Sequence, residues 1–486
     1  MIKIYFSQHF NVSPKVLDKY GAFNISLIND LPLFIDPFHL FNSNKISYRR
    51  LHEEMICYLR FLRDKSVDSQ VSKGLLKGWY TFPEVKQNWL GFCSSGNKGR
   101  GLGIDFAISL NRSMNIIFTD FGEEKIASGS HLEKLCLIRS GVGKDNISDF
   151  TTNLIKEFLL KYTQTFARKH ISKKFRRKVT VDKVKFNYNT ETWDCREFDL
   201  PCINDDYVLL TPKEILTKDD VWINRTDLIN DYDRIANALE NVQLRDQVNN
   251  YLLRILPKDE TKKQRREAIA KVLERYPQVL EYYIRSKERR GNEAKWLSEK
   301  KVFESELFYI QQIIEFVSEL NVNTKFYSIK GDTLKEARAR VDFLKDIIEN
   351  KGGYRIFYVK GNPIKREADL QIMFRLTWFG TPSDISREVN NGRGPVDFKI
   401  SRGSKDKSLV EFKLASNTQL KRNLNNQVEI YEKASDTIKS LKVILYFSSE
   451  ELDKVQNILK ELKIDKNDSI ILVDARSDNK PSASKA

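Results

Sequence analysis

Cysteine and histidine are scarce in this chain, and their spacing does not suggest metal binding. Only 5 of the 486 residues are histidine and 5 are cysteine, and the cysteines, at positions 57, 93, 136, 195 and 202, form no Cys-x-x-Cys pair. Zinc sites and disulfide frameworks need closely spaced or evenly numbered residues of this kind. We therefore expect neither a zinc site nor a disulfide framework, and we expect the thiols to be reduced, as in a cytoplasm.

Long apolar runs and ATP-binding loops are also missing. No uninterrupted apolar stretch approaches the length of about 20 residues that a membrane-spanning helix needs. The apolar run that begins at Met1 is too short for a signal peptide and lacks a small-residue cleavage pattern. The glycine-rich segment 96–103 is not followed by Gly-Lys-Ser/Thr, which favours a surface loop over a Walker A loop. These absences predict a soluble cytoplasmic protein without a membrane partner.

Positive charge is abundant, by contrast. The chain holds 82 Lys and Arg against 66 Asp and Glu, for a formal net charge of +16, and 41% of its residues are hydrophobic. A basic balance suits a polyanionic partner, because neutralising phosphates releases their counterions. The length predicts about two to four domains. Composition therefore points to an ordered multidomain protein with a nucleic acid as its partner.

The order of predicted elements indicates a multidomain α/β protein. Residues 1–210 read as a mixed α/β N-terminal domain for sensing or assembly, with a helix at 104–111 and a strand at 115–121 among its elements. Residues 211–332 form a helical, strongly charged middle region that includes one long helix over 296–320. Residues 333–477 read as an α/β domain, and 478–486 as a disordered tail.

Two segments of the N-terminal domain are ambiguous. Asp145, Ser148, Asp149 and Thr152 are crowded together, either as a second acidic site or as a polar helix entry with Ser148 or Asp149 as its N-cap. The basic run 168–178 fits either a segment that tracks a nucleic-acid backbone or a solvated connector. The sequence does not separate these alternatives.

The C-terminal domain carries the clearest chemical pattern. Asp397 begins one predicted strand after a glycine-containing turn, and Glu411 and Lys413 lie on the next strand. Side chains alternate between the faces of a strand, so Glu411 and Lys413 share one face while their apolar neighbours share the other. Charged groups flanked by core residues are costly unless they are paired or bound to a metal. If the two strands pair through the turn 402–407, Asp397 and Glu411 converge on one cation.

This pattern resembles the PD-(D/E)xK nuclease superfamily. Gln427 and Tyr431, four residues apart on the helix after the Glu-x-Lys strand, resemble the Gln-x-x-x-Tyr helix of the RecB-like branch. Pro395 and Asp397 are separated by Val396, whereas the literal motif has them adjacent. The resemblance covers roughly the last third of the chain.

The resemblance implies a restriction-endonuclease-like core, a central mixed sheet flanked by helices, over 333–477. It also implies a further acidic residue on the helix before that sheet, for which Glu367 is the first candidate and Asp369 the second.

The resemblance further implies a Mg²⁺-dependent enzyme, with Mn²⁺ as a substitute, that hydrolyses phosphodiester bonds of DNA. Asp397, Glu411 and the backbone carbonyl of Phe412 would hold the metal, and Lys413 would orient the attacking water. Gln427 and Tyr431 would brace the site. By analogy with other multidomain proteins that contain such a module, we expect an endonuclease of restriction or anti-phage defence, acting as a homo-oligomer or with a partner defence subunit.

Alternative interpretations remain open. The substrate is either DNA or RNA, and the module is either active or a catalytically silent nucleic-acid-binding scaffold. Arg393 and Lys399 flank the motif and are either phosphate contacts or ordinary surface charges.

Overall fold

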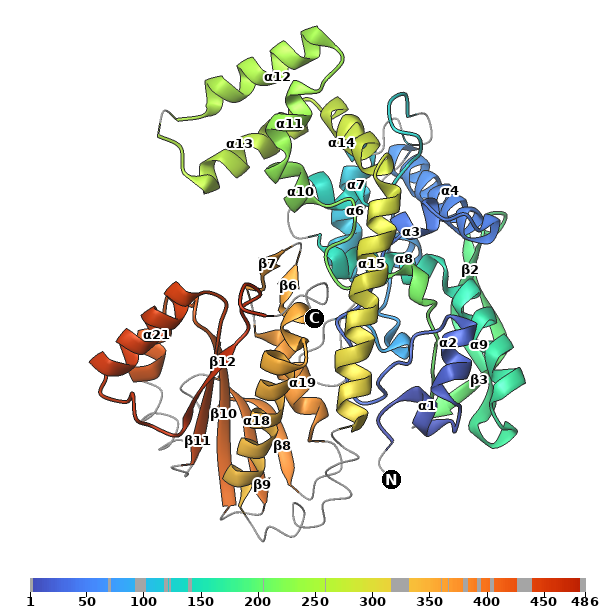
Figure 1. The fold of residues 1–486 in the computed structure, drawn as a ribbon. Helices are drawn as coiled ribbons and strands as arrows, with labels where there is room; N and C mark the ends of the chain where they lie inside the picture. Colours follow the sequence, from blue (N-terminus) through green and yellow to red (C-terminus); the bar gives the residue numbers. More distant parts are fainter. Residues whose placement is uncertain are drawn as a thin grey trace.

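The computed structural model describes residues 3–68, 71–91, 102–117, 121, 124–138, 142–203, 205–257, 259–315, 332–359, 361–365, 367–378, 383–390, 395–402, 406–425 and 439–480. Helices and strands both contribute to the fold, and a five-stranded mixed sheet forms its C-terminal part (Figure 1). The predicted mixed α/β class is therefore confirmed. None of the described helices is long and apolar enough to cross a membrane.

The N-terminal part of the chain is mainly helical and carries a long β-ribbon of two strands, to which the short strand β4 (Asp206–Tyr207) adds a third. In this ribbon β2 (Arg176–Asn187) pairs antiparallel with β3 (Thr192–Ile203). The other elements described here are α1 (Phe6–His9), α2 (Pro14–Tyr20), β1 (Phe34–Ile35), α3 (Phe38–Phe41), α4 (Ile46–Asp68), α5 (Lys73–Trp79), α6 (Ile104–Ile117), α7 (Lys134–Ile138), α8 (Lys144–Leu154), α9 (Lys156–His170) and β5 (Leu216–Thr217).

The prediction of a strand over 115–121 is wrong for its first three residues, which belong to a helix. The helix expected at 104–111 continues as α6 to Ile117. Ala107, Leu110 and Met114 are all buried and recur at the three- and four-residue spacing of one helix face. A short apolar run is compatible with either a helix or a strand, and here the packing of the preceding turns continues the helix.

The basic run 168–178 is divided between two elements of the ribbon region. α9 ends at His170 and β2 begins at Arg176. Arg176 forms an ion pair with Asp199 at 2.5 Å, and Lys178 forms one with Glu197 at 2.8 Å, both across the β2–β3 pairing. Acidic residues of β3 thus neutralise part of the run, which favours a structural role for it.

The middle of the chain is helical. Its helices are α10 (Arg225–Asn230), α11 (Tyr232–Asn237), α12 (Val242–Ile255), α13 (Lys262–Arg275), α14 (Gln278–Glu288) and α15 (Gly291–Glu306). α15 begins five residues before the long helix expected at 296 and passes at its C-terminal end into a π-helical turn, Leu307–Gln311. Lys301 of α15 donates hydrogen bonds to the carbonyl oxygens of Arg355 and Tyr358 at 3.1 and 2.7 Å, so this helix links the middle region to the C-terminal part.

The C-terminal part is built around the five-stranded sheet, with strand order β12-β11-β10-β9-β8. The strands β8, β9 and β10 are antiparallel neighbours, whereas β10, β11 and β12 are parallel. α18 packs against the sheet on the face that contains Phe398 and Phe412, and α21 packs on the face that contains Ile444. The elements are α18 (Thr333–Asn350), the 3-10 helix η5 (Gly353–Phe357), β6 (Tyr358–Val359), β7 (Asn362–Pro363), α19 (Ala368–Leu376), β8 (Asp384–Asn390), β9 (Pro395–Arg402), β10 (Asp406–Leu414), β11 (Ser440–Tyr446), α21 (Ser449–Glu461) and β12 (Ile470–Asp474).

One hydrophobic core cluster joins the N-terminal and C-terminal parts. It contains Phe23 and Leu216 together with Phe398 and Phe412, all buried. A second cluster holds the buried side chains of α4, α6 and the helices that follow β5. The shared core fixes the C-terminal sheet to the rest of the protein.

Candidate active site where β9 and β10 diverge

The strands β9 and β10 separate near the predicted site. Their pairing runs from Arg402 opposite Asp406 to Phe398 opposite Val410, whereas β10 stays paired with β11 as far as Leu414. Beyond Val410, this edge of β10 therefore needs other hydrogen-bond partners, because a buried backbone amide without one is costly.

Two carboxylates supply those partners. The amide of Phe412 donates to Oδ2 of Asp397 at 2.6 Å, and the amide of Leu414 donates to Oε1 of Glu367 at 3.2 Å. The amides of Leu409 and Ala415 instead donate to carbonyls on the β11 side, so those of Phe412 and Leu414 face β9 by the alternation of a strand. Asp397 and Glu367 thus take the place of the β9 backbone along the end of β10.

Asp397 lies on the sheet face opposite to the core residues of its strand. Phe398 and Ile400 are fully buried against α18 and α19, and alternation directs Asp397 to the other face. Burial raises the pKa of Asp397 to about 6, and the carboxylates of Glu411 and Glu367 contribute to this increase, while Lys413 and the Phe412 amide oppose it. Asp397 therefore changes charge close to neutral pH.

Glu411 and Lys413 form an ion pair on the same face. The Nζ of Lys413 lies 2.9 Å from Oε1 of Glu411, and the side chains are only 19% and 8% exposed. Burial disfavours the charge on Lys413, but the carboxylates of Glu411 and Asp397 outweigh it and raise the pKa of the ammonium group. The lysine thus remains charged between partly desolvated carboxylates.

Glu367 and Asp369 have different surroundings, although they are only two residues apart. Glu367 immediately precedes α19 and lies within electrostatic range of Asp397 and Lys413. Asp369 accepts hydrogen bonds from Lys218 at 2.9 Å and from the hydroxyl of Tyr309. Asp369 therefore joins the C-terminal part to the rest of the chain, and Glu367 is the acidic residue that the structure brings to the site.

The remaining predicted residues are less informative. Gln427, Tyr431 and Arg393 lie outside the described residues. Lys399 is half-buried on β9, two residues from Asp397 and therefore on the same face. The side chain of Phe412 is buried against the rings of Phe374 and Phe398, with centroids 5.1 and 6.0 Å away, which leaves its backbone as the part available to a ligand.

The donor chemistry of the site suits a divalent cation. Three carboxylates, Asp397, Glu411 and Glu367, lie within electrostatic range of the ammonium group of Lys413, so these four groups together carry two negative charges in excess when fully ionised. Magnesium prefers such oxygen ligands. Within the part of the chain that the structure describes, no three His, Cys, Asp or Glu side chains are already arranged to hold a metal ion. In the described arrangement a backbone amide and Lys413 occupy oxygens of Asp397 and Glu411.

A second group of carboxylates lies in the N-terminal part. Burial raises the pKa of Asp30 and of Asp149 to about 8, and Glu84 and Asp145 add to both shifts. Asp145 and Asp149 are close in sequence, but Asp30 and Glu84 come from distant segments that no local pattern connects to them. The structure thus assembles a larger acidic group than the sequence indicated.

The polar residues of this segment have structural roles. α8 begins at Lys144 with Gly143 as its N-cap, not at the expected Ser148 or Asp149, and the Asn146 side chain accepts a hydrogen bond from the Gly143 amide at 3.1 Å. The hydroxyl of Ser148 accepts a hydrogen bond from the amide of Ile35 at 2.9 Å, and the hydroxyl of Thr152 donates to the carbonyl of Ser148 at 2.7 Å. The Ser148 hydroxyl thus joins α8 to β1, and the Thr152 hydroxyl forms a hydrogen bond within α8.

Comparisons with known proteins match two segments of the chain. Residues 11–224 match a family described as Domain of unknown function (DUF8370), and residues 333–449 match a family described as Domain of unknown function (DUF8371). The second segment contains Glu367, Asp397, Glu411 and Lys413. No curated protein and no solved structure matches the chain.

Proposed function

We propose that the C-terminal part of this protein is a Mg²⁺-dependent nuclease of the PD-(D/E)xK type that hydrolyses phosphodiester bonds of DNA. The observation that carries this proposal is the convergence of Asp397, Glu411, Glu367 and Lys413 where β9 and β10 diverge. The central mixed sheet with helices on both faces also agrees with the architecture that the resemblance implies. The net charge of +16 suits a nucleic-acid substrate.

Each residue has a distinct part in this reaction. Asp397 and Glu411, with the carbonyl of Phe412, would hold the metal, which when bound lowers the pKa of water and offsets charge on the phosphate. Lys413 orients the attacking water and places its positive charge beside the phosphate. Glu367 fixes the end of β10 through the Leu414 amide and adds negative charge that favours cation binding. The proton on Asp397 has to leave before this carboxylate binds a cation, which favours activity above about pH 6.

A wider biological role extends the proposal. The combination of a nuclease-like module with a separate N-terminal part and a helical middle region is consistent with an endonuclease of restriction or anti-phage defence. In such a protein the N-terminal and helical parts would sense a trigger or assemble with partner subunits.

The direct test is digestion of plasmid DNA, single-stranded DNA and RNA by the purified full chain in Mg²⁺, in Mn²⁺ and in EDTA. We expect metal-dependent cleavage of DNA that is lost in Asp397→Asn. A matched Asp406→Asn variant changes a carboxylate at the other end of the β9–β10 pairing, where it binds Thr333 and Lys439. Equal cleavage by wild type and Asp397→Asn would refute the proposal, and cleavage of RNA alone would refute its DNA substrate.

A further inference from the structure

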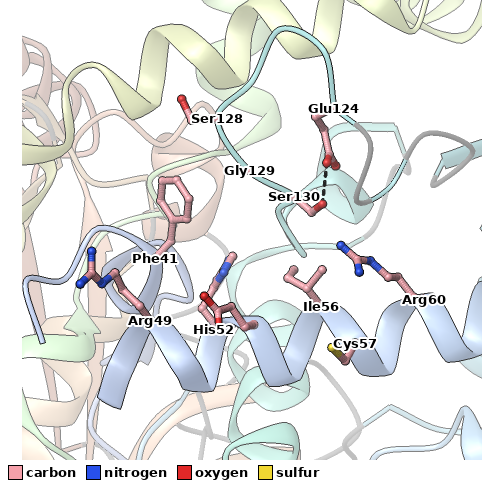
Figure 2. A pocket seen from close by; sticks show the side chains of 11 residues that line it. Phe41, Arg49, His52, Ile56, Cys57, Arg60, Glu124, Ser128, Gly129 and Ser130 are labelled. Carbon is pink, nitrogen blue, oxygen red and sulfur yellow. Dashed lines mark hydrogen bonds between the residues drawn. The ribbon is translucent and has the colours of Figure 1, made fainter. Parts of the chain in front are cut away.

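A cavity of about 440 Å³ lies in the N-terminal part, between α4 and the loop at 124–130 (Figure 2). Its volume falls within the range of roughly 300–1,000 Å³ that is usual for small-molecule sites. α4 lies on the other side of the molecule from the C-terminal sheet (Figure 1). The cavity is therefore separate from the candidate active site.

One face of α4 forms the floor of this cavity. Arg49, His52, Ile56 and Arg60 follow one another at intervals of three, four and four residues, which places them in a row along one side of the helix. Figure 2 shows these side chains rising from α4 toward the opposite loop. With the described residues, the guanidinium groups of Arg49 and Arg60 form no ion pair or hydrogen bond. The row thus offers a positive charge at each end and an apolar side chain between them.

His52 has a polar atom that lacks a partner. The side chain is buried, with only 5% of the residue exposed, and its Nε2 has no hydrogen-bond partner among the described residues. Burial, assisted by the neighbouring His131, lowers the pKa of His52 to about 3, so the imidazole is neutral at pH 7. A buried polar atom without a hydrogen bond is costly, and a bound ligand would supply the missing partner.

The opposite loop is held in place by α14. The carboxylate of Glu288 accepts hydrogen bonds from the amides of Ser128 and Gly129 at 2.7 and 3.0 Å. The loop also packs closely on Phe41, because a Cβ atom added at Gly129 would lie 2.7 Å from its ring. The ring of Phe41 in turn lies 5.3 Å from that of His52, measured between centroids. The cavity is therefore preformed, with an aromatic wall beside the unpartnered imidazole.

Among the described residues, neither of the two acidic ones that line the cavity forms an ion pair with Arg49 or Arg60. Glu124 pairs with Lys134 at 3.2 Å, an ammonium group that it shares with Glu281 at 2.5 Å, and accepts a hydrogen bond from Ser130 at 2.7 Å. Glu53 is exposed at the rim, next in sequence to His52. Its carboxylate is available to accept hydrogen bonds from hydroxyl or amino groups of a ligand.

We propose that this cavity binds a nucleotide, with its phosphate on Arg60 and its base over Ile56, against the side of the cavity that Phe41 and His52 form together. Arg49 closes the other end, and Glu53 accepts hydrogen bonds from the sugar or from an exocyclic amine. A phosphate, a planar ring and hydrogen-bond donors on one molecule match the cation, the aromatic wall and the carboxylate of this site, whereas a simple anion would leave the wall unused. The nucleotide is either free or the terminal residue of a strand, and its binding does not depend on the proposed cleavage reaction.

The test is isothermal titration calorimetry on the full chain in EDTA, so that no metal supports the candidate active site. The probes are AMP, ATP, inorganic phosphate and a 5′-phosphorylated trinucleotide. We expect saturable binding of a nucleotide probe that is about tenfold or more weaker in Arg60→Ala, because a charge-assisted hydrogen bond is lost. Arg50→Ala, on the same helix but outside the cavity, is the matched control and keeps the wild-type affinity.

Two further variants sharpen this test. Phe41→Leu should weaken the binding of nucleotides, because their base contacts the aromatic ring. The affinity for inorganic phosphate, which has no base, should not change. Lys413→Ala should bind nucleotides normally even when it no longer cleaves DNA, which separates this site from the proposed function.

The outcomes are distinct. Preference for AMP or ATP supports a free nucleotide, and preference for the trinucleotide supports a strand terminus. Absence of saturable binding for every probe, equal losses in Arg50→Ala and Arg60→Ala, or phosphate binding as tightly as the nucleotides would overturn the proposal.

Discussion

Two groups of carboxylates in this protein differ in how their charge is balanced. In the N-terminal group, each neighbouring residue that shifts the pKa of Asp30 or Asp149 is another carboxylate, and both pKa values rise to about 8. At the C-terminal site, Lys413 and the Phe412 amide oppose the same effects, and the pKa of Asp397 rises only to about 6. At neutral pH Asp30 and Asp149 hold protons, whereas Asp397 is largely ionised.

The largest expected effect comes from removing the central cation of the C-terminal site. Lys413→Met retains the length of the side chain but loses its charge, which leaves the surrounding carboxylates without compensation. We expect DNA cleavage to fall by about a thousandfold or more, because in the proposed reaction the lysine acts on the attacking water and the phosphate. The measurement is the rate of plasmid nicking in Mg²⁺. Lys407→Met is the control, because Lys407 lies on the same strand at the far end of the β9–β10 pairing. This variant should keep the wild-type rate. Equal rates for Lys413→Met and Lys407→Met would exclude a catalytic role of Lys413.

The pH dependence of cleavage should follow Asp397. Below about pH 6 we expect the rate to fall by about tenfold per pH unit, since only the ionised carboxylate binds a cation. A higher Mg²⁺ concentration should move the midpoint to lower pH, because metal and proton compete for Asp397. Rate measurements from pH 5 to 8 at two Mg²⁺ concentrations check this. The same pH midpoint at both concentrations would contradict it.

Glu367 should affect cleavage in two separable ways. Glu367→Gln keeps an oxygen for the Leu414 amide but removes a charge that raises the pKa of Asp397, so the pH midpoint should move lower. Glu367→Ala also removes the hydrogen-bond acceptor, and we expect about a tenfold lower rate from the loosened end of β10. Identical pH–rate profiles for Glu367→Gln and Glu367→Ala would show that the hydrogen bond to the Leu414 amide does not affect the rate.

The smallest expected effect concerns the stability of the N-terminal group. The carboxyl of Asp149 titrates near 3.8 without the fold and near 8 within it, so stability decreases as pH rises between these values and is constant above them. Asp149→Asn should remove this loss and raise the Tm at pH 8 by about 2 °C or more, with little change at pH 4. Thermal unfolding followed by circular dichroism checks this. Asp259→Asn, an exposed control, should show no such pH dependence, and a lower Tm for Asp149→Asn at pH 8 would contradict the argument.

The local part of the C-terminal site was predictable because hairpin neighbours are close in sequence. Alternation along β10 placed Glu411 and Lys413 on one face, and the short connection to β9 brought Asp397 beside them. The strand boundaries followed from apolar runs between polar turns. Glu367 and Asp369 became candidates through a resemblance. The hydrogen bond from the Leu414 amide to Glu367 could not be predicted, because it depends on the divergence of β9 and β10 in the folded chain.

Elsewhere the sequence was a weaker guide. The apolar residues that follow Asn115 suggested a strand, but α6 continues to Ile117 because its preceding turns are already packed. The basic run 168–178 fitted either a nucleic-acid contact or a solvated connector, and the sequence did not reveal that acidic residues of β3 pair with part of it. The cavity under the 124–130 loop gave no signal in the sequence, because its two walls come from segments about 70 residues apart.

The sequence alone therefore determined the mixed α/β class, the strands of the C-terminal sheet and the acidic and basic residues that its periodicity places on one face. Tertiary structure decided which carboxylates meet, which charges are neutralised, and where a cavity remains open. The physical reason is that strand alternation depends on neighbouring residues, whereas burial and electrostatic interactions depend on segments that only the folded chain brings together.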